Sequence, residues 1–132
     1  MALTISQLAK SVGVGVETVR YYQRRGLLFD PRPSSGAGSR AGRHYGETEQ
    51  RRLAFIRHAQ AAGFTLAEIG ELLALDAAQD RARVRTMAGS RIAALDAQIA
   101  ALQDARRALV RLSDECARSE TGPCPIIEAF ER

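Results

Sequence analysis

The last third of the chain has apolar residues spaced as in a long helix that pairs with another helix. These residues form a seam in which the steps along the chain alternate between three and four residues, and one position of the seam is not apolar. The apolar members are Ile92, Leu95, Ile99, Leu102 and Leu109. Arg106 occupies the interrupted position, and no Gly or Pro lies between Gly89 and Cys116. Roughly 30 residues of helix form a rod on the order of 45 Å long, whose apolar stripe a lone small domain would leave exposed. We therefore expect a dimerisation helix over 81–115, and we favour a homodimer over a helix that folds back on its own head.

Four shorter helices are expected within residues 1–75. Thr4 with Gln7, and Thr65 with Glu68, have the spacing of a capping box, which predicts a helix after each threonine. Between them, apolar periodicity and glycine stops predict helices over about 16–25 and 47–62. The residues of the 47–62 helix that we expect to face the core are Leu53, Phe55, Ile56 and Ala59.

The first two of these helices flank a glycine-containing turn at 13–15, which is the pattern of a helix-turn-helix. The second helix carries Arg20, Tyr21 and Arg24 on its outer side, where they would enter a major groove. Residues 29–45 are rich in Gly, Pro and Ser and contain spaced arginines. This composition predicts a loop or short hairpin, a wing, and a solvated flexible linker is the alternative.

The positive charge is concentrated in the head. Residues 1–58 contain ten Lys or Arg against four acidic residues, whereas residues 59–132 contain nine Arg against eleven acidic residues, within a net charge of +4. A polyanion is therefore expected to bind the head rather than the tail.

The tail contains the only two cysteines of the chain, Cys116 and Cys124. Gly122, Pro123 and Pro125 predict a turn that brings the two thiols to one centre, and Pro125 can begin a short apolar helix. Two thiolates suffice for a linear bond to a soft ion such as Cu(I), whereas Zn(II) requires four ligands.

Several other classes of protein do not fit the sequence. No apolar run approaches the 18 or so residues of a membrane span, and residues 1–10 lack the features of a secretory signal, so we expect a cytoplasmic protein with no membrane partner. In that reducing compartment the cysteines are expected to be ligands or redox thiols rather than a structural disulfide. An enzyme is not expected, because no catalytic constellation has a plausible frame and the chain lacks a Cys-x-x-Cys motif.

Motifs along nearly the whole chain resemble those of MerR-family transcription regulators. The opening motif is the most specific of them, and it consists of Gln7-Leu8-Ala9, Gly13-Val14 and Thr18-Val19-Arg20-Tyr21-Tyr22. Gly26-Leu27-Leu28 and Gly63-Phe64-Thr65-Leu66 follow it in the right order. The resemblance implies a mainly α fold, with a winged helix-turn-helix head over 1–75, a dimerisation helix over 81–115 that forms an antiparallel coiled coil, and an effector loop with a short helix over 116–132. It also implies a homodimer on a palindromic promoter, distortion of the DNA so that RNA polymerase can engage, and a set of DNA-binding residues: Thr18, Arg20, Tyr21, Arg43, Tyr45 and Arg57.

The cysteine spacing, followed by Pro125-Ile126-Ile127-Glu128, resembles the copper-efflux branch of that family, whose members respond to Cu(I), Ag(I) or Au(I). Cys116 and Cys124 would then be the metal ligands. Divalent-metal sensors usually have a further cysteine near the position of Arg81, where copper-type members usually have serine. A guanidinium from Arg81 or Arg85 would neutralise the negative charge of a two-thiolate complex with a monovalent ion, and the alternatives are that it blocks the site or favours another effector. Sensing of Hg(II), of another divalent metal or of thiol oxidation by the same two cysteines is the alternative.

Overall fold

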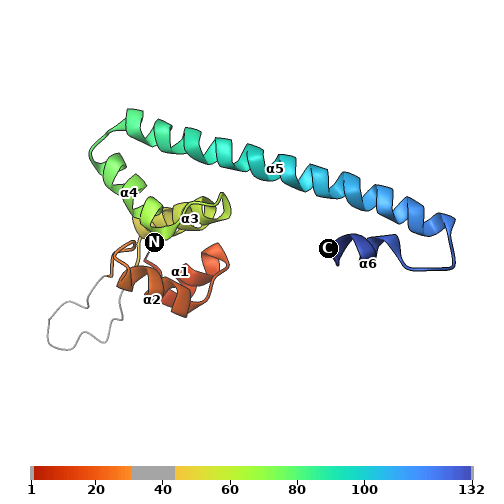
Figure 1. The fold of residues 1–132 in the computed structure, drawn as a ribbon. Coiled ribbons are helices and arrows are strands. Elements are labelled where there is room, and N and C mark those ends of the chain that lie inside the picture. The colour runs from red at the N-terminus through yellow and green to blue at the C-terminus, as the bar shows by residue number, and fades with distance from the viewer. Residues whose placement is uncertain (1, 31–43, 132) are drawn as a thin grey trace, which may run out of the picture. The chain divides into compact units, whose positions relative to one another are not determined.

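The computed structural model describes residues 2–30 and 44–131, and its regular structure within them is helical (Figure 1). This confirms the predicted mainly α fold. The helices, in chain order, are α1 (Ile5–Val12), α2 (Val16–Arg24), α3 (Glu47–Ala61), α4 (Leu66–Ala77), α5 (Arg81–Arg118) and α6 (Pro125–Phe130). The described residues also form one isolated antiparallel bridge, in which Leu3 and Tyr45 exchange N–H···O hydrogen bonds of 2.7 and 2.8 Å.

Helices α1 and α4 begin where the sequence predicts, each after a threonine whose side chain caps the helix. The Thr4 and Thr65 side chains accept hydrogen bonds from the backbone N–H groups of Gln7 and Glu68, which donate 3.2 and 3.1 Å bonds. The Gln7 and Glu68 side chains in turn accept from the threonine N–H groups, so both predicted capping boxes are confirmed. The turn after α1 needs Gly13, whose φ of +74° strains any residue with a Cβ.

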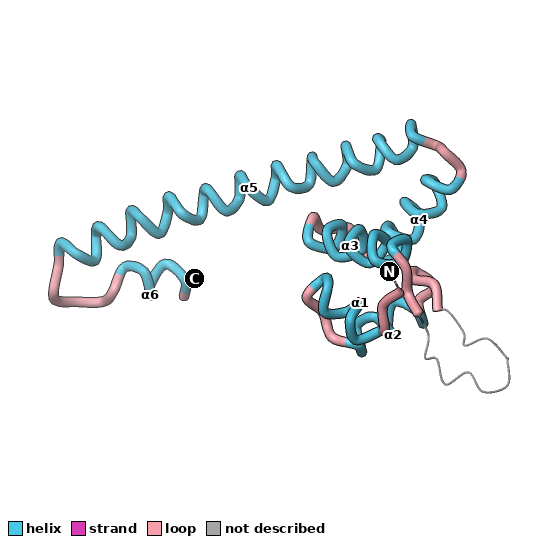
Figure 2. The backbone as a smooth tube through the Cα atoms, turned by 180° about the vertical axis from the view of Figure 1, so that it is seen from behind, coloured by secondary structure: helices cyan, strands magenta, loops and turns pink. Residues whose placement is uncertain are grey.

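The chain forms two compact units, residues 1–86 and 87–132. In the first unit, α1 packs on α2 and α3, and α3 packs on α4 (Figure 2). Their shared core is apolar and includes these fully buried side chains: Leu8, Val19, Leu53, Ile56 and Ile69. Tyr45, at the end of the predicted wing, belongs to the same core and is only 1% exposed. The core therefore holds the inner side of α2 and leaves its outer side to solvent.

Phe55 does not face this core, so its predicted inward position was wrong. It is 37% exposed, because it lies about 200° around α3 from Leu53, whereas Ile56 at i+3 returns to the buried side. Phe55 lines a hollow of about 410 Å³ together with Leu72, Leu73 and Val84. Part of the apolar surface of α3 is thus open to solvent in the single chain.

The second unit consists of α5 from Met87 onward, a turn and α6. The dimerisation helix expected over 81–115 corresponds to α5, which begins at Arg81 and continues to Arg118. The helix continues because no Gly or Pro lies between Gly89 and Gly122, which has a φ of +92° in the turn. Pro125 occupies the first turn of α6, as predicted. None of the helices in the described part of the chain is long and apolar enough to cross a membrane.

Candidate functional site

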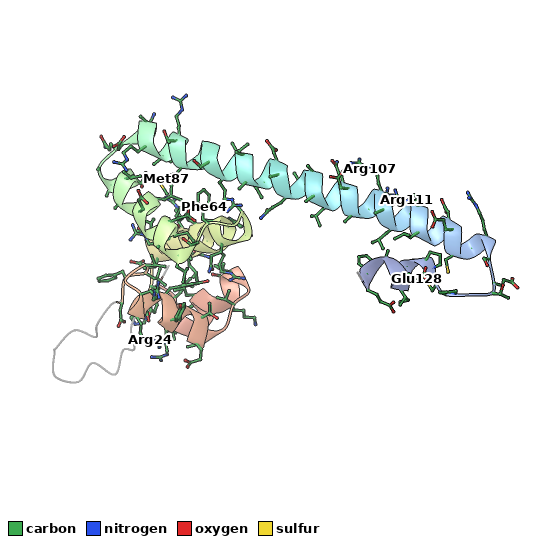
Figure 3. The ribbon with its side chains drawn as sticks, in the orientation of Figure 1. Arg24, Phe64, Met87, Arg107, Arg111 and Glu128 are labelled. Carbon is green, nitrogen blue, oxygen red and sulfur yellow. The ribbon has the colours of Figure 1, made fainter. Side chains whose placement is uncertain are left out.

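The outer side of α2 presents cations and a phenol ring to solvent. Arg20, Tyr21 and Arg24 are exposed, while Val19 and Tyr22 are buried beneath them. Figure 3 labels Arg24 on α2. The Arg24 guanidinium carbon lies 6.0 Å from the centroid of the Tyr21 ring, and that of Arg25 lies 5.9 Å from it. These cation–π contacts hold two positive charges beside an aromatic surface. The arrangement suits contact with phosphates and base edges.

Two further features shape this surface. Arg20 and Arg24 line a small polar hollow of about 180 Å³ together with Gln23 and Asp30, large enough for an anionic oxygen group. Thr18 is half-buried in the first turn of α2, where its N–H donates a 3.1 Å bond to the Gly15 carbonyl. Its hydroxyl thus lies at the helix end that recognition helices direct toward DNA.

Hydrogen bonds between side chains join α2 to α3. The Tyr22 hydroxyl donates to Gln60 Oε1 at 2.5 Å and accepts from Arg57 Nη1 at 3.3 Å. The Tyr22 ring is buried, whereas Arg57 is exposed. Tyr22 therefore holds the Arg57 guanidinium next to the recognition helix, on the same unit as Arg20.

Tyr45 and Arg43 were both predicted to hold phosphates from the wing. Arg43 lies outside the described residues. The Tyr45 ring is buried in the core, and its hydroxyl accepts a 2.8 Å bond from Gln23 Nε2 of α2. Tyr45 thus anchors the end of the wing to the recognition helix. A phosphate contact from Tyr45 stays a prediction, and only its phenolic O–H would be able to make it.

The two cysteines meet in the second unit. Cys116 lies in the last turns of α5 and Cys124 immediately precedes α6, and their Sγ atoms are 3.7 Å apart. The turn between them is stabilised by Ser119, whose hydroxyl donates to the Thr121 carbonyl at 2.8 Å. Both thiols are half-buried. The predicted convergence of the two thiols is therefore present in the structure.

The two thiols have unlike environments. The backbone N–H groups of Ile127 and Ile126, followed by the Cys116 thiol, lower the pKa of Cys124. The hydrogen bond with Cys124, together with the charge of a Cys124 thiolate, raises the pKa of Cys116. Cys124 therefore ionises first, and its thiolate accepts a hydrogen bond from the neutral Cys116.

This donor set fits a soft ion of low coordination number. Two metal–sulfur bonds of about 2.3 Å in a straight line place the sulfurs about 4.6 Å apart. Side-chain rotations that lengthen the 3.7 Å Sγ–Sγ distance by about 0.9 Å would therefore admit such an ion. Within residues 2–30 and 44–131, no three His, Cys, Asp or Glu side chains gather in a way that would hold a metal ion. Two sulfurs complete the coordination of a two-coordinate soft ion, whereas Zn(II) prefers four ligands.

Comparisons with known proteins identify the family of the chain. A family model described as "MerR HTH family regulatory protein" matches residues 3–76, and one described as "MerR, DNA binding" matches residues 50–112. The mercuric resistance operon regulatory protein of Serratia marcescens is 38% identical over 130 residues, which cover 98% of this chain and 88% of that protein. The chain belongs to the MerR family of regulatory proteins.

Solved structures of MerR-family proteins have the same fold. A transcription regulator from Ralstonia metallidurans, crystallised with lead(II), has a TM-score of 0.67 and 32% identity, with 97% of this chain and 98% of that chain covered. A MerR regulator from Bacillus megaterium, crystallised with mercury(II), has a TM-score of 0.64 and 29% identity, with 98% and 100% covered.

Membership of the MerR family confirms several predictions. The chain is a DNA-binding transcription regulator and not an enzyme, and regulators of this family bind promoter DNA as dimers. The structure brings Arg20, Tyr21 and Arg57 onto one unit and brings Cys116 and Cys124 together.

Other residues of the sites were either untested or missed. Arg81 and Arg85 are exposed in the first turns of α5 and belong to the first unit, so a role for them beside the metal stays a prediction. The positioning side chains Gln23 and Gln60 were missed, because each contacts a residue 22 or 38 positions away and has no local signature.

Proposed function

We propose that this MerR-family regulator acts in the cytoplasm as a homodimer on a palindromic promoter, and changes transcription by RNA polymerase when a soft metal ion binds Cys116 and Cys124. The observation that carries the proposal is the 3.7 Å separation of the sulfurs of Cys116, near the end of α5, and Cys124, just before α6, on a chain with a DNA-binding head. Thiolates prefer soft ions, which distinguishes this site from oxygen-rich sites for Mg²⁺ or Ca²⁺.

The residues of the head supply DNA affinity in this proposal. Arg20, Arg57 and Arg43 neutralise phosphates, while Thr18, Tyr21 and Tyr45 add hydrogen bonds to the backbone that fix the register on the duplex. Few of these side chains reach base edges, so part of the sequence preference comes from how easily the site bends. Metal binding then needs only to shift the bound dimer between two conformations, and overall DNA affinity changes little.

A monovalent ion, Cu(I) or its relatives Ag(I) and Au(I), is the leading effector. Two thiolates complete its linear coordination, and the chain has no third cysteine to add. The complex has a net charge of −1, which the cationic side chains of Arg81 or Arg85 would offset if the dimer places them nearby.

Hg(II) is the second candidate. It is favoured by the similarity to a mercuric resistance regulator along 98% of the chain, and by the neutrality of a dithiolate complex with a +2 ion. Sensing of another divalent metal or of thiol oxidation would use the same sulfur pair without the linear monovalent complex.

In vitro transcription from the cognate promoter with a panel of Cu(I), Ag(I), Au(I), Hg(II), Pb(II), Zn(II) and a thiol oxidant would test the proposal. Activation by monovalent ions at about one ion per subunit is expected, with none by Zn(II). Cys116→Ser and Cys124→Ser should each abolish activation while DNA binding persists. Ser119→Ala, which alters the same turn but keeps both thiols, is the matched control. Activation that survives either cysteine change would contradict the two-thiolate site, and activation by Hg(II) or Pb(II) alone would replace the monovalent assignment.

A further inference from the structure

The apolar face of α5 is uncovered in the single chain. None of the residues of α5 is buried, and four members of its seam are about half or more exposed: Ile92 at 57%, Ile99 at 52%, Leu102 at 70% and Leu109 at 43%. In the proposed homodimer, a second copy of this chain covers this apolar face. The spacing and the charges along this face determine how the two copies would align.

The seam has a spacing that is symmetric about its own centre. Its six positions are separated by steps of three, four, three, four and three residues, the same in both directions: Ile92, Leu95, Ile99, Leu102, Arg106 and Leu109. Two antiparallel copies can therefore place every seam position opposite another one, with the two-fold axis passing between Ala100 and Ala101. The opposed pairs are Ile92 with Leu109, Leu95 with Arg106, and Ile99 with Leu102.

Arg106 decides between this alignment and the others. In a parallel pair, Arg106 would lie opposite Arg106 of the partner subunit, and two like charges would meet in one layer. In the symmetric antiparallel pair it lies opposite Leu95 of the partner subunit. The next residue along the partner helix is Asp96, which flanks the seam on the same side as Arg106.

Antiparallel alignments shifted by one heptad lose this acidic neighbour. A shift in one direction would place Gly89 of the partner subunit at the position of Asp96, and a shift in the other would place Gln103 there. Both shifted alignments still match some apolar layers, so burial of apolar surface alone does not separate them from the symmetric one. Charge complementarity does separate them.

The side chains of the single chain leave both charges available. Among the described residues, neither Arg106 nor Asp96 has a side-chain hydrogen bond or an ion pair. The neighbouring Asp104 and Arg107, by contrast, already pair with each other within α5. Arg106 also borders a shallow hollow of about 630 Å³ between Leu102 and Leu109, at the level where the partner's Leu95 would insert.

We propose that Arg106 of each subunit pairs with Asp96 of the partner subunit, and that these two symmetric ion pairs fix the register of the dimer and select a second copy of this chain as the partner. This inference rests on the proposed homodimer. A charged residue in a seam lowers stability and raises specificity, because any partner or register that lacks the matching acid leaves the guanidinium against apolar side chains. The pair thus discriminates against related regulators that have a similar apolar face.

Charge reversal provides the test, with sedimentation equilibrium of the full chain at low ionic strength as the measurement. In a homodimer, Arg106→Asp would bring two carboxylates together across the seam, and Asp96→Arg would bring two guanidinium groups together. Each variant alone should therefore weaken self-association by on the order of tenfold. In an equal mixture of the two variants, a heterodimer places a carboxylate opposite a guanidinium at both sites, so the mixture should associate more tightly than either variant alone.

The doubly reversed chain gives the cleanest comparison. A chain with both Arg106→Asp and Asp96→Arg regains an opposite-charge pair at each of the two symmetric sites, with the signs exchanged. Its self-association should return to within about twofold of the wild type, although each single change costs on the order of tenfold. Recovery of this kind measures the coupling between the two positions directly, because independent effects of the two changes would multiply to about a hundredfold loss.

The outcomes separate the inference from the homodimer on which it rests. Arg107→Asp, on the solvent side of α5, is the matched control and should leave self-association within about twofold of the wild type. A monomeric wild type would overturn the homodimer. A dimeric wild type whose doubly reversed variant shows the multiplied loss would overturn the register and the ion pair alone. Circular dichroism of each variant checks that α5 remains helical, and recovery in the double variant excludes a simple folding defect.

Discussion

Tyr22→Phe removes one oxygen atom from the contact between the recognition helix and α3. The ring is 2% exposed and stays in place, so burial of apolar surface is unchanged. The hydroxyl donates to Gln60 at 2.5 Å, and a neutral hydrogen bond of this kind contributes about 1 kcal/mol to the free energy of unfolding. Its 3.3 Å bond from the exposed Arg57 adds a few tenths of a kcal/mol. Gln60 is only half-buried and can bind water instead, so no large desolvation penalty remains.

We therefore expect Tyr22→Phe to destabilise the head by about 1–1.5 kcal/mol, and its melting temperature to fall by roughly 4–8 °C per kcal/mol. Scanning calorimetry of the full chain measures this change. Tyr21→Phe is the matched control, because the neighbouring ring is 40% exposed and its hydroxyl has no hydrogen bond among the described residues, so stability should change by less than about 0.5 kcal/mol. If the two variants melted together, the hydroxyl of Tyr22 would not connect the two helices.

DNA binding gives a second measurement for the same substitution. Tyr22→Phe keeps every cation, so the slope of log affinity against log salt should stay the same even if affinity falls. Arg57→Gln should instead reduce the magnitude of that slope by about 0.9, since one fewer phosphate is neutralised. A changed slope for Tyr22→Phe would mean that loss of the hydroxyl removes Arg57 from the DNA altogether.

Three other predictions concern the DNA-binding surface of α2, the seam of α5 and the pair of cysteines. Arg20→Ala should weaken DNA binding and reduce the magnitude of the salt slope by about 0.9 in filter-binding titrations, and an unchanged slope would remove Arg20 from the interface. Ile99→Asp should convert the dimer into monomers in sedimentation experiments, because a carboxylate would be buried in the seam, and an intact dimer would contradict the pairing of the two α5 helices. Cys124 should react with iodoacetamide faster than Cys116 near pH 7, since its lowered pKa gives it more thiolate. The difference should shrink as pH rises above the ordinary thiol pKa, and peptide mass spectrometry that found Cys116 the faster thiol would reverse the assignment.

The features that sequence alone predicted are those determined by neighbouring residues. The capping boxes at Thr4 and Thr65 depend on residues three positions apart, so they are visible in the sequence and present in the fold. The convergence of Cys116 and Cys124 depends on a short turn whose Gly and Pro residues are equally visible.

The features that sequence missed depend on contacts between distant residues or on helix rotation. The bond from Tyr22 to Gln60 spans 38 positions, and the burial of Tyr45 depends on its pairing with Leu3. Phe55 was placed in the core because it is large and apolar, although the rotation of α3 that buries Leu53 and Ile56 turns it outward. Composition identifies which residues are apolar, and only packing decides which of them are covered.

The absence of any buried residue on α5 has a consequence for how this protein folds. The head has its own apolar core, so its folding is a unimolecular reaction and its stability does not depend on how much protein is present. Cover of the α5 seam by a second chain depends on concentration, so at concentrations above the dissociation constant each tenfold dilution removes about 1.4 kcal/mol of the free energy that assembly adds. Heating should therefore give one transition that is independent of protein concentration and a second that moves to lower temperature on dilution. In a cell, the abundance of the chain would then set a threshold for forming the symmetric regulator, before any metal is encountered.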